Sequence, residues 1–414
     1  MTRKVAHITL QAVSPLKVGS NASDLIQDSP IQRDFNALPM ILGTSIAGVL
    51  RKDFKAEKVN DIFGDDNGSK VIFSNALLLD ENDKVSEELL LEKSRFLKLF
   101  DNLPIREHTA ITEKGVAKEH GKFDEEVVYR GTRFKFSIEL IENDKESFEE
   151  ILSLLSSTSF RLGGGSTKGF GKFKIIEIKT DEFDLESYEN YSSSLNHLLS
   201  KTHKIESVNS SNYIKYSLKI KPDDFFMFGS GFGDSDADMT PVYEQTIDYD
   251  KKDLTDKMIL IPASSLKGAI AHRTTYHYNL KKERYIGNSD AKESIKEIFG
   301  EAKDSKKEID GSKGKVIFSD CFLVDNNESK IFDHVSIDRF TGGAIDGALF
   351  QEKTIAQKDE LEIEILLHKD VVGTEKEAFE SALTDITTGM LALGGMTTKG
   401  HGVFIGSWSK SDGK

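Results

Sequence analysis

The chain is 414 residues long, with 38% hydrophobic and 30% charged residues, a composition typical of a soluble globular protein of two or three domains. Its net charge of −14 argues against a polyanionic partner, because nucleic-acid affinity depends on lysine and arginine. The single cysteine, Cys321, excludes disulfides within the chain and cysteine-rich zinc sites. No apolar run reaches the length of a membrane span, and no signal-peptide core follows Met1, so we expect a cytoplasmic protein.

The first half of the chain predicts strands and helices in alternation. Residues 4–13 alternate polar and apolar side chains, as in a half-buried strand, and the polar residues 14–35 are typical of a long loop. Residues 41–51 predict a helix with Thr44 or Ser45 as its N-cap. The later predicted elements are strands at 70–79 and 133–140, an amphipathic helix at 145–157 and a final strand after residue 171.

One glycine-rich stretch occurs twice, at residues 162–173 (LGGGSTKGFGKF) and at residues 393–404 (LGGMTTKGHGVF). Glycine accepts positive φ and has no Cβ, so such a loop lets backbone N–H groups approach a phosphate beside Lys168 or Lys399. A single copy would more simply be a tight turn before a strand. The constant offset of 231 residues across twelve positions favours a shared function instead.

Other segments also repeat, at shifting offsets that indicate one scaffold with loops of different length. The repeated pairs are 41–51 and 261–271 (offset 220), 62–64 and 298–300 (236), 70–74 and 315–319 (245), and 108–111 and 334–337 (226). We therefore predict two domains, 1–180 and 213–414, joined by a serine-rich linker at 181–212. The order strand, helix, strand, strand, helix, strand in each half predicts an α+β fold of two tandem ferredoxin-like domains, the arrangement of RNA-recognition modules.

The repeated motifs resemble the RAMP superfamily and, within it, the backbone subunit of type III CRISPR effector complexes. The motifs that carry the resemblance are IPASSLKG at 261–268, IFG at 298–300, VIFSD at 316–320, IDRFTGGA at 337–344 and the second glycine loop. Because the resemblance covers nearly the whole chain twice, the protein is similar to two backbone subunits fused in tandem, as in the type III-D arrangement. It implies a thumb-like hairpin in each half and, as partners, the CRISPR guide RNA, the target RNA, a large polymerase- or cyclase-like subunit and further RAMP subunits.

The resemblance implies that the glycine loops and the helices that follow the SSLKG-type motif hold the guide backbone, and helix N-termini do attract phosphates. The implied RNA-binding residues are Thr44, Ser45, Arg51, Gly164, Gly165, Ser166, Thr167 and Lys168 in the first half, and Ser264, Ser265, Lys267, Arg273, Arg339, Gly395, Thr397, Thr398 and Lys399 in the second. Ala47 stands where the second half has Lys267, and we expect Arg51 to replace that contact one helical turn later. Residues 108–113 also lack the acid–arginine pair of the second thumb motif, 334–339.

The resemblance further implies metal-dependent cleavage of target RNA by an aspartate that precedes a proline in the loop after the first strand. Asp28 fits this pattern in the first half, and Asp238 fits it in the second with one extra residue, with Asp236 as its rival. The neighbouring 2′-hydroxyl is the nucleophile, and Asp28 or Asp238 would orient it or hold Mg²⁺ or Mn²⁺ weakly, together with RNA phosphates. The simpler alternative is that both aspartates only form turns beside prolines.

Two other functions stay open. In the first, one or both halves bind RNA without cutting it, and the chain acts as a ruler within the assembly. In the second, the chain is an endoribonuclease that matures the guide RNA. A histidine and a lysine beside one cleft would favour the second function, and the sequence presents no such pair at convincing positions. We expect His108 and His334 to be packed or hydrogen-bonded residues. Nucleotide binding has little support, because no GxxxxGK[ST] motif is present.

Overall fold

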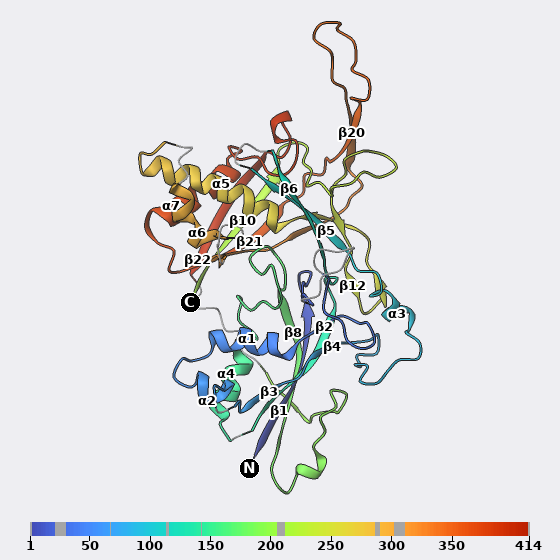
Figure 1. Ribbon diagram of the computed structural model, residues 1–414, viewed down its shortest axis with the longest axis vertical. Helices are drawn as coiled ribbons and strands as arrows, with labels where there is room; N and C mark the ends of the chain where they lie inside the picture. Colours follow the sequence, from blue (N-terminus) through green and yellow to red (C-terminus); the bar gives the residue numbers. More distant parts are fainter. Residues whose placement is uncertain are drawn as a thin grey trace.

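The computed structural model describes residues 2–20, 30–66, 68–112, 116–141, 143–204, 212–285, 290–301 and 311–412. Each half builds an antiparallel sheet with helices against it, and the two halves lie end to end (Figure 1). None of the helices in these ranges combines the length and the hydrophobicity needed to span a bilayer.

The first half contains the elements β1 to β9. They are the strands β1 (Arg3–Ala12), β2 (Met40–Ile41), β3 (Val71–Phe73), β4 (Ala76–Leu78), β5 (Ile105–Ile111), β6 (Ala117–Glu126), β7 (Arg133–Leu140), β8 (Phe173–Phe183) and β9 (Lys201–Thr202), the helices α1 (Gly43–Asp53), α2 (Val59–Phe63), α3 (Arg95–Lys98) and α4 (Lys145–Leu154), and the 3₁₀ turn η1 (Tyr188–Asn190).

The second half contains the elements β10 to β22. They are the strands β10 (Tyr213–Pro222), β11 (Tyr243–Glu244), β12 (Ile247–Asp248), β13 (Asp253–Leu254), β14 (Met258–Ile261), β15 (Gly300–Glu301), β16 (Ser312–Lys313), β17 (Val316–Phe318), β18 (Cys321–Val324), β19 (Ser329–His334), β20 (Phe350–Ile355), β21 (Leu361–His368) and β22 (Phe404–Asp412), the helices α5 (Ala263–Lys281), α6 (Asp290–Phe299) and α7 (Gly373–Thr387), and the 3₁₀ turn η2 (Thr397–Lys399).

The strand order in both main sheets is ferredoxin-like, which confirms the predicted fold class. In the second half the order is β22, β10, β21, β17, so the first strand lies between the last and the third, and all neighbours are antiparallel. In the first half β8, β1 and β7 occupy the same places, and β3 and β4 both pair with β7. The duplication inferred from short motifs therefore extends to the whole topology.

Each sheet buries its own hydrophobic core because apolar residues recur at the strand and helix periods. Ile8, Ile46 and Phe136 are fully buried in the first core, and Tyr216 and Phe379 lie in the second. Burial of one such side chain contributes roughly 1.5–3 kcal/mol. Two separate cores are consistent with two folding units.

The ends of the helices depend on partners far away in the sequence. Asp144 caps α4 through a hydrogen bond from the Ser147 N–H (3.0 Å), which is a local signal. Helix α1 has no side-chain cap of this kind, so the prediction that Thr44 or Ser45 is its N-cap is wrong. The helix begins at Gly43, whose N–H donates instead to Asn75 Oδ1 (2.9 Å) on the neighbouring β-segment.

A hairpin of the second half packs inside the core of the first half. Ile247 and Tyr249, at the β12–β13 hairpin, are buried there, and the Tyr249 hydroxyl donates to the Leu79 carbonyl (2.9 Å) and accepts the Arg133 N–H (3.0 Å). The Tyr249 ring also meets Phe96 of α3, with ring centres 5.0 Å apart. We call this contact the interlock.

The two parts of the interlock are insertions that occur once each. The N–H of Met40 donates to the Gln32 carbonyl, and the equivalent N–H of Leu260 donates to the Val242 carbonyl. Met40 is 8 positions after Gln32, but Leu260 is 18 positions after Val242, and the longer segment contains the β12–β13 hairpin. Conversely, α3 lies in a segment between β4 and β5 that has only a short counterpart between β18 and β19. The halves are therefore joined by features that neither half duplicates.

Part of the segment predicted as a linker packs on the first sheet. Phe183 and Leu199 are buried with Val5, and Leu195 belongs to the first core. Residues 205–211 lie outside the described residues, and the boundary between the domains stays a prediction.

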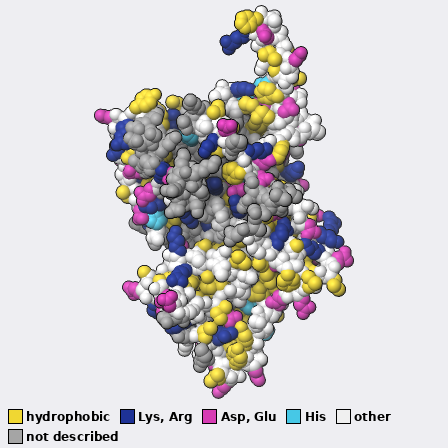
Figure 2. All heavy atoms as spheres, in the orientation of Figure 1, with side chains coloured by type: hydrophobic (Ala, Val, Ile, Leu, Met, Phe, Trp, Pro, Cys, Tyr) yellow, Lys and Arg dark blue, Asp and Glu magenta, His cyan; other side chains and the backbone are white. Residues whose placement is uncertain are grey.

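Two long hairpins leave the sheets at the positions of the predicted thumbs. The β5–β6 hairpin runs along the second half, and the β19–β20 hairpin projects beyond the body of the molecule (Figure 1). Figure 2 shows hydrophobic side chains on this projection, and Phe340 near its tip is 99% exposed. Each half thus has a thumb-like hairpin, including the half whose thumb motif is weaker in sequence.

Candidate nucleic-acid interface

The two glycine loops have the same backbone conformation. In both, the first leucine donates its N–H to the carbonyl of the last glycine of the motif, Leu162 to Gly171 (3.0 Å) and Leu393 to Gly402 (2.8 Å). A Cβ on Gly171 or Gly402 would lie 2.0 Å from that leucine's carbonyl oxygen, and both glycines have positive φ. The chain's own backbone therefore requires these glycines, so phosphate approach is not needed to explain them.

The lysine of each loop stands over an aromatic ring of the neighbouring hairpin. Lys168 Nζ lies 5.8 Å from the centre of the Phe123 ring, and Lys399 Nζ lies 4.8 Å from that of Phe350. Lys168 is half-buried, whereas Lys399 is exposed. Both lysines are placed at the base of a thumb-like hairpin, where a cation and an aromatic face are the two elements that single-stranded RNA binders use.

A histidine stacks on the same ring in each half. The ring centres of His108 and Phe123 are 5.0 Å apart, and those of His334 and Phe350 are 4.8 Å apart. The prediction that no histidine and lysine share one site is therefore wrong, because each pair meets at one phenylalanine. The sequence had matched the two histidines, but the phenylalanines occur on the return strand, at a different offset, and were missed.

A glutamate two residues after each phenylalanine holds the histidine. His334 Nε2 is 3.1 Å from Glu352 Oε2, and the Glu352 side chain is 0% exposed. His108 Nε2 is 3.3 Å from Glu125 Oε2, an ion-pair contact whose angles fall short of a hydrogen bond. As expected, both histidines are held by partners rather than free in solvent.

The charges around the two glutamates differ. Lys17 Nζ contacts Glu125 Oε1 at 2.5 Å. Burial alone would raise the pKa of Glu125, but the contacts from His108 and Lys17 lower it to about 2. In the second half a histidine replaces the lysine, because His401 Nδ1 lies 3.3 Å from Glu352 Oε1.

A lysine of the second half reaches the glycine loop of the first. Lys267, on α5, donates to Thr167 Oγ1 (2.9 Å), and burial together with the charge of Lys168 lowers the pKa of Lys267 to about 8. Within the described residues, no carboxylate lies at ion-pair distance from Lys267. Two cations without an acidic partner form a site suited to a phosphate, and residues of both halves make it.

A buried arginine of the first hairpin holds the start of α5. Arg106 Nη1 contacts Asp320 Oδ2 at 2.8 Å, and its Nε contacts Glu244. Burial would lower the pKa of Arg106, but the charges of Asp320 and Glu244 raise it above its usual value. Asp320 Oδ1 also accepts the N–H of Ala263, the first residue of α5 (2.8 Å). Arg106 thus helps to set the position of Lys267.

The two loops differ in what covers them. A Cβ on Gly169 would meet Asp320 and Ala263 of the second half at 2.5 and 2.8 Å, whereas one on the equivalent Gly400 would meet nothing within 4 Å. The first loop is therefore part of the junction between the halves, and the second faces outward.

The bridges at the two ends of this loop correspond in the two halves. Gly19 bridges to Ile31 and Gly229 bridges to Pro241, so both bridging residues lie at an offset of 210. In the sequence Asp28 and Asp238 have the same offset, and Asp238 has one extra residue before its proline. Asp28 itself lies outside the described residues.

Asp238 and its rival have different surroundings. Asp238 is exposed and accepts the N–H of Gln351 on β20 through Oδ2 (2.8 Å). Asp236 instead forms an ion pair with Lys353 (3.3 Å). In the described part of the chain, no group of three or more histidine, cysteine, aspartate or glutamate side chains is arranged to hold a metal. The single carboxylate of Asp238 fits an ion completed by RNA oxygens rather than by protein.

Several predicted RNA-binding residues have structural roles. Arg51 donates to the Gly64 carbonyl (2.8 Å) and to Asn60 (3.0 Å), so it fastens α2 and does not take the place of Lys267. Arg273 pairs with Asp385 of α7. The remaining predicted residues lie in the first turns of α1 and α5 (Thr44, Ser45, Ser264, Ser265), in the two loops (Gly164, Gly165, Ser166, Gly395, Thr397, Thr398) or at the exposed hairpin tip (Arg339).

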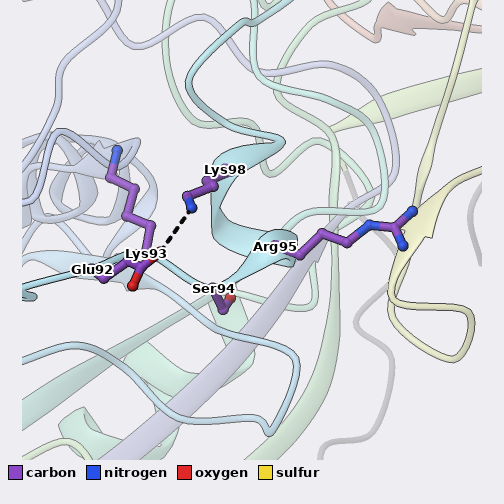
Figure 3. Close-up of a pocket in the computed structure, with 5 residues that line it drawn as sticks. All are labelled: Glu92, Lys93, Ser94, Arg95 and Lys98. Atoms are coloured by element: carbon purple, nitrogen blue, oxygen red, sulfur yellow. Dashed lines mark hydrogen bonds and ion pairs between the residues drawn. The ribbon is translucent and has the colours of Figure 1, made fainter.

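A shallow depression beside α3 does not resemble an active site. It is lined by Glu92, Lys93, Ser94, Arg95 and Lys98 (Figure 3). Lys98 pairs with Glu92 at 3.2 Å, and Arg95 points away from the depression, where it contacts Asp253 of the second half at 2.8 Å. Arg95 therefore supports the junction between the halves.

Comparison with known proteins agrees with the duplicated fold. The profile of the RAMP superfamily matches residues 9–174 and 226–405. No curated protein matches the sequence. Among solved structures, a chain of the "Type III-B Cmr-beta bound to cognate target RNA" is 16% identical with a TM-score of 0.33, and the match covers 43% of this chain and 61% of that one. Because the profile matches most of the sequence, once in each half, the chain belongs to the RAMP superfamily.

Proposed function

We propose that the chain is the guide-RNA-binding backbone subunit of a type III CRISPR effector complex, with two centres that cut complementary target RNA. The observation that carries the proposal is the recurrence, in both halves, of a loop lysine, a stacked phenylalanine and histidine, and a buried glutamate at the base of a thumb-like hairpin. Membership of the RAMP superfamily supports an RNA partner, and other subunits of such a complex would be further partners.

The local charges make RNA binding compatible with a net charge of −14. Lys168 and Lys267 adjoin at the junction without an acidic partner among the described residues, and Lys399 is exposed on the second loop. A bound phosphate would offset the burial and the repulsion from Lys168 that together lower the pKa of Lys267. The affinity would therefore come from a few placed cations rather than from the overall charge.

In the cleavage reaction, Asp238 would act on the 2′-hydroxyl next to the scissile phosphate. Its Oδ2 is fixed by the Gln351 N–H, which leaves the exposed carboxylate oriented by β20. Mg²⁺ or Mn²⁺, held by Asp238 and RNA phosphates, would offset negative charge on the scissile phosphate. Asp28 would act in the same way in the first half, because in the sequence it precedes Asp238 by the same 210 positions that relate the bridges at the ends of the two loops.

Two alternatives remain candidates. A non-catalytic ruler would use the same lysines and hairpins without cutting. Maturation of the guide RNA is favoured by one specific observation, the meeting of a histidine and a lysine at Phe123 and again at Phe350.

The test is cleavage of a labelled target RNA by the guide-loaded effector complex with Mg²⁺. We expect Asp28→Ala and Asp238→Ala each to remove one product while guide binding persists. Asp236→Ala is the matched control, because its carboxylate is two residues away but paired with Lys353, and it should leave both products. Unchanged cutting by both Asp28→Ala and Asp238→Ala would identify the chain as a scaffold, and cleavage of the precursor guide alone would favour maturation.

A further inference from the structure

The bases of the two hairpins differ at several positions but share the loop lysine and three residues of the hairpin itself. Three equivalent positions carry different residues in the first and second halves, namely Lys17 and Met227, Arg106 and Phe332, and Phe170 and His401. The histidine, phenylalanine and glutamate are kept in both halves, with ring distances of 5.0 and 4.8 Å. The His334 ring is 26% exposed, and an aliphatic side chain in its place would pack about as well. The retained trio therefore points to chemistry.

The position of His334 suits proton transfer. Glu352 accepts its Nε2–H and is itself fully buried, so the ring has one orientation and Nδ1 is the nitrogen that Glu352 does not engage. Gln351, which fixes Asp238, lies between Phe350 and Glu352 on the same strand. His334 and the proposed catalytic carboxylate are thus attached to three consecutive residues of β20.

The other charged groups around this site come from three elements. Lys399 and His401 belong to the glycine loop, and Lys399 stands over the Phe350 ring. On β20, Lys353 is engaged by Asp234 and Asp236. On β19, Lys330 stands over the Phe332 ring (4.9 Å), and Asp333 accepts a hydrogen bond from Gln351. The imidazole of His334 is held by Glu352, which directly follows Gln351, the residue whose N–H fixes Asp238.

We propose that His334 is the general acid of RNA cleavage in the second half. The inference rests on the proposed function. The 2′-hydroxyl gives its proton to the Asp238 carboxylate or to water held by it, and its oxygen bonds to phosphorus. The P–O5′ bond breaks, and O5′ takes the Nδ1 proton of the imidazolium. The products are a 2′,3′-cyclic phosphate and a 5′-hydroxyl, with the imidazole left neutral.

The test compares two target RNAs in the guide-loaded complex, one natural and one with sulfur in place of the bridging 5′-oxygen at the second-half cleavage position. A thiolate leaves without protonation, so it does not need a general acid. We expect His334→Gln to slow cleavage of the natural linkage by roughly 10²-fold or more, and that of the 5′-thio linkage by less than about tenfold. His272→Gln, at an exposed histidine of α5 away from this hairpin, should leave both rates near wild type.

The outcomes separate this inference from the proposed function. Equal slowing of both linkages by His334→Gln, or no slowing of either, would overturn the assignment of the general acid. If Asp238→Ala still removes its product in the same preparations, only the inference about His334 fails. A wild-type complex that cuts neither RNA would overturn the proposed function together with this inference. Guide binding by each variant checks that the hairpin remains folded.

Discussion

The buried arginine at the junction gives the sharpest test of how the halves are held together. The side chains of Arg106, Asp320 and Glu244 are 6%, 1% and 7% exposed, and the guanidinium bridges the two carboxylates. In Arg106→Met, two buried carboxylates would lose their cation. Breaking a buried pair in this way costs about 3–5 kcal/mol, because the remaining charge is desolvated and unpaired.

The matched control is an exposed ion pair across the junction. Arg95 is 87% exposed and contacts Asp253 at 2.8 Å, so Arg95→Met should cost less than about 1 kcal/mol. The assay is urea unfolding of the full chain at pH 7, followed by circular dichroism and by the fluorescence of Trp408. We expect the midpoint to fall markedly for Arg106→Met and to change little for Arg95→Met.

A triple variant distinguishes loss of the charge pair from loss of packing. In Arg106→Met combined with Glu244→Gln and Asp320→Asn, no orphan carboxylate remains, and most of the lost stability should return. A change in Arg106→Met no larger than in Arg95→Met would refute the reasoning. So would a triple variant less stable than Arg106→Met, because it would assign the cost to shape rather than to charge.

Three further predictions concern the lysines. Lys168→Ala and Lys399→Ala should each weaken guide binding without sequence preference, and each should lower the slope of log K against log salt by about one. Filter binding at several salt concentrations measures this slope, and an unchanged slope would exclude these lysines from phosphate contact. The pKa of Lys267 is lowered to about 8 in the folded chain, so the unfolded chain binds more protons than the folded chain between pH 8 and 10.5. The stability of the RNA-free chain should therefore rise with pH in that window, and Lys267→Met should flatten the rise. An equal change in urea midpoint between pH 8 and pH 10 in both proteins would contradict this. The pKa of Glu125 is about 2 in the folded chain, so its contribution to stability is present above pH 4.5 and is lost as the pH falls toward 2. Lys17→Met should therefore be destabilised mainly above pH 4.5. If acid titration by circular dichroism shows no difference between the two proteins above pH 4.5, the Lys17 contact is unimportant.

The sequence was sufficient for the duplication and the fold class, because those depend on local patterns that repeat. The loop lysines, Lys168 and Lys399, and the two thumb histidines were found for the same reason. What could not be predicted are contacts between distant segments. The N–H of Gly43 donates to Asn75 Oδ1, a residue too far away in the sequence for a local capping pattern to predict. Thr44 or Ser45 was therefore wrongly expected to cap α1.

The candidate site was only partly predictable for the same physical reason. Phe123 and Phe350 join the site through strand pairing, and the offset between them differs from that between the histidines, so no single alignment of the two halves presents both pairs. Lys267 completes a loop 100 residues earlier, which depends on how the halves pack. Arg51 was expected to replace, in the first half, the phosphate contact of Lys267, but Arg51 donates to the Gly64 carbonyl at the end of α2.

The interlock has a consequence for distance. Tyr249 and its hairpin fit a recess that includes Phe96, and each of these features exists once in the chain. Because these side chains pack in one arrangement, the spacing between the two loop lysines is fixed by this contact rather than by the segment that joins the domains. Under the proposed function, lengthening or cutting that segment would leave the spacing of the two centres along an RNA strand unchanged.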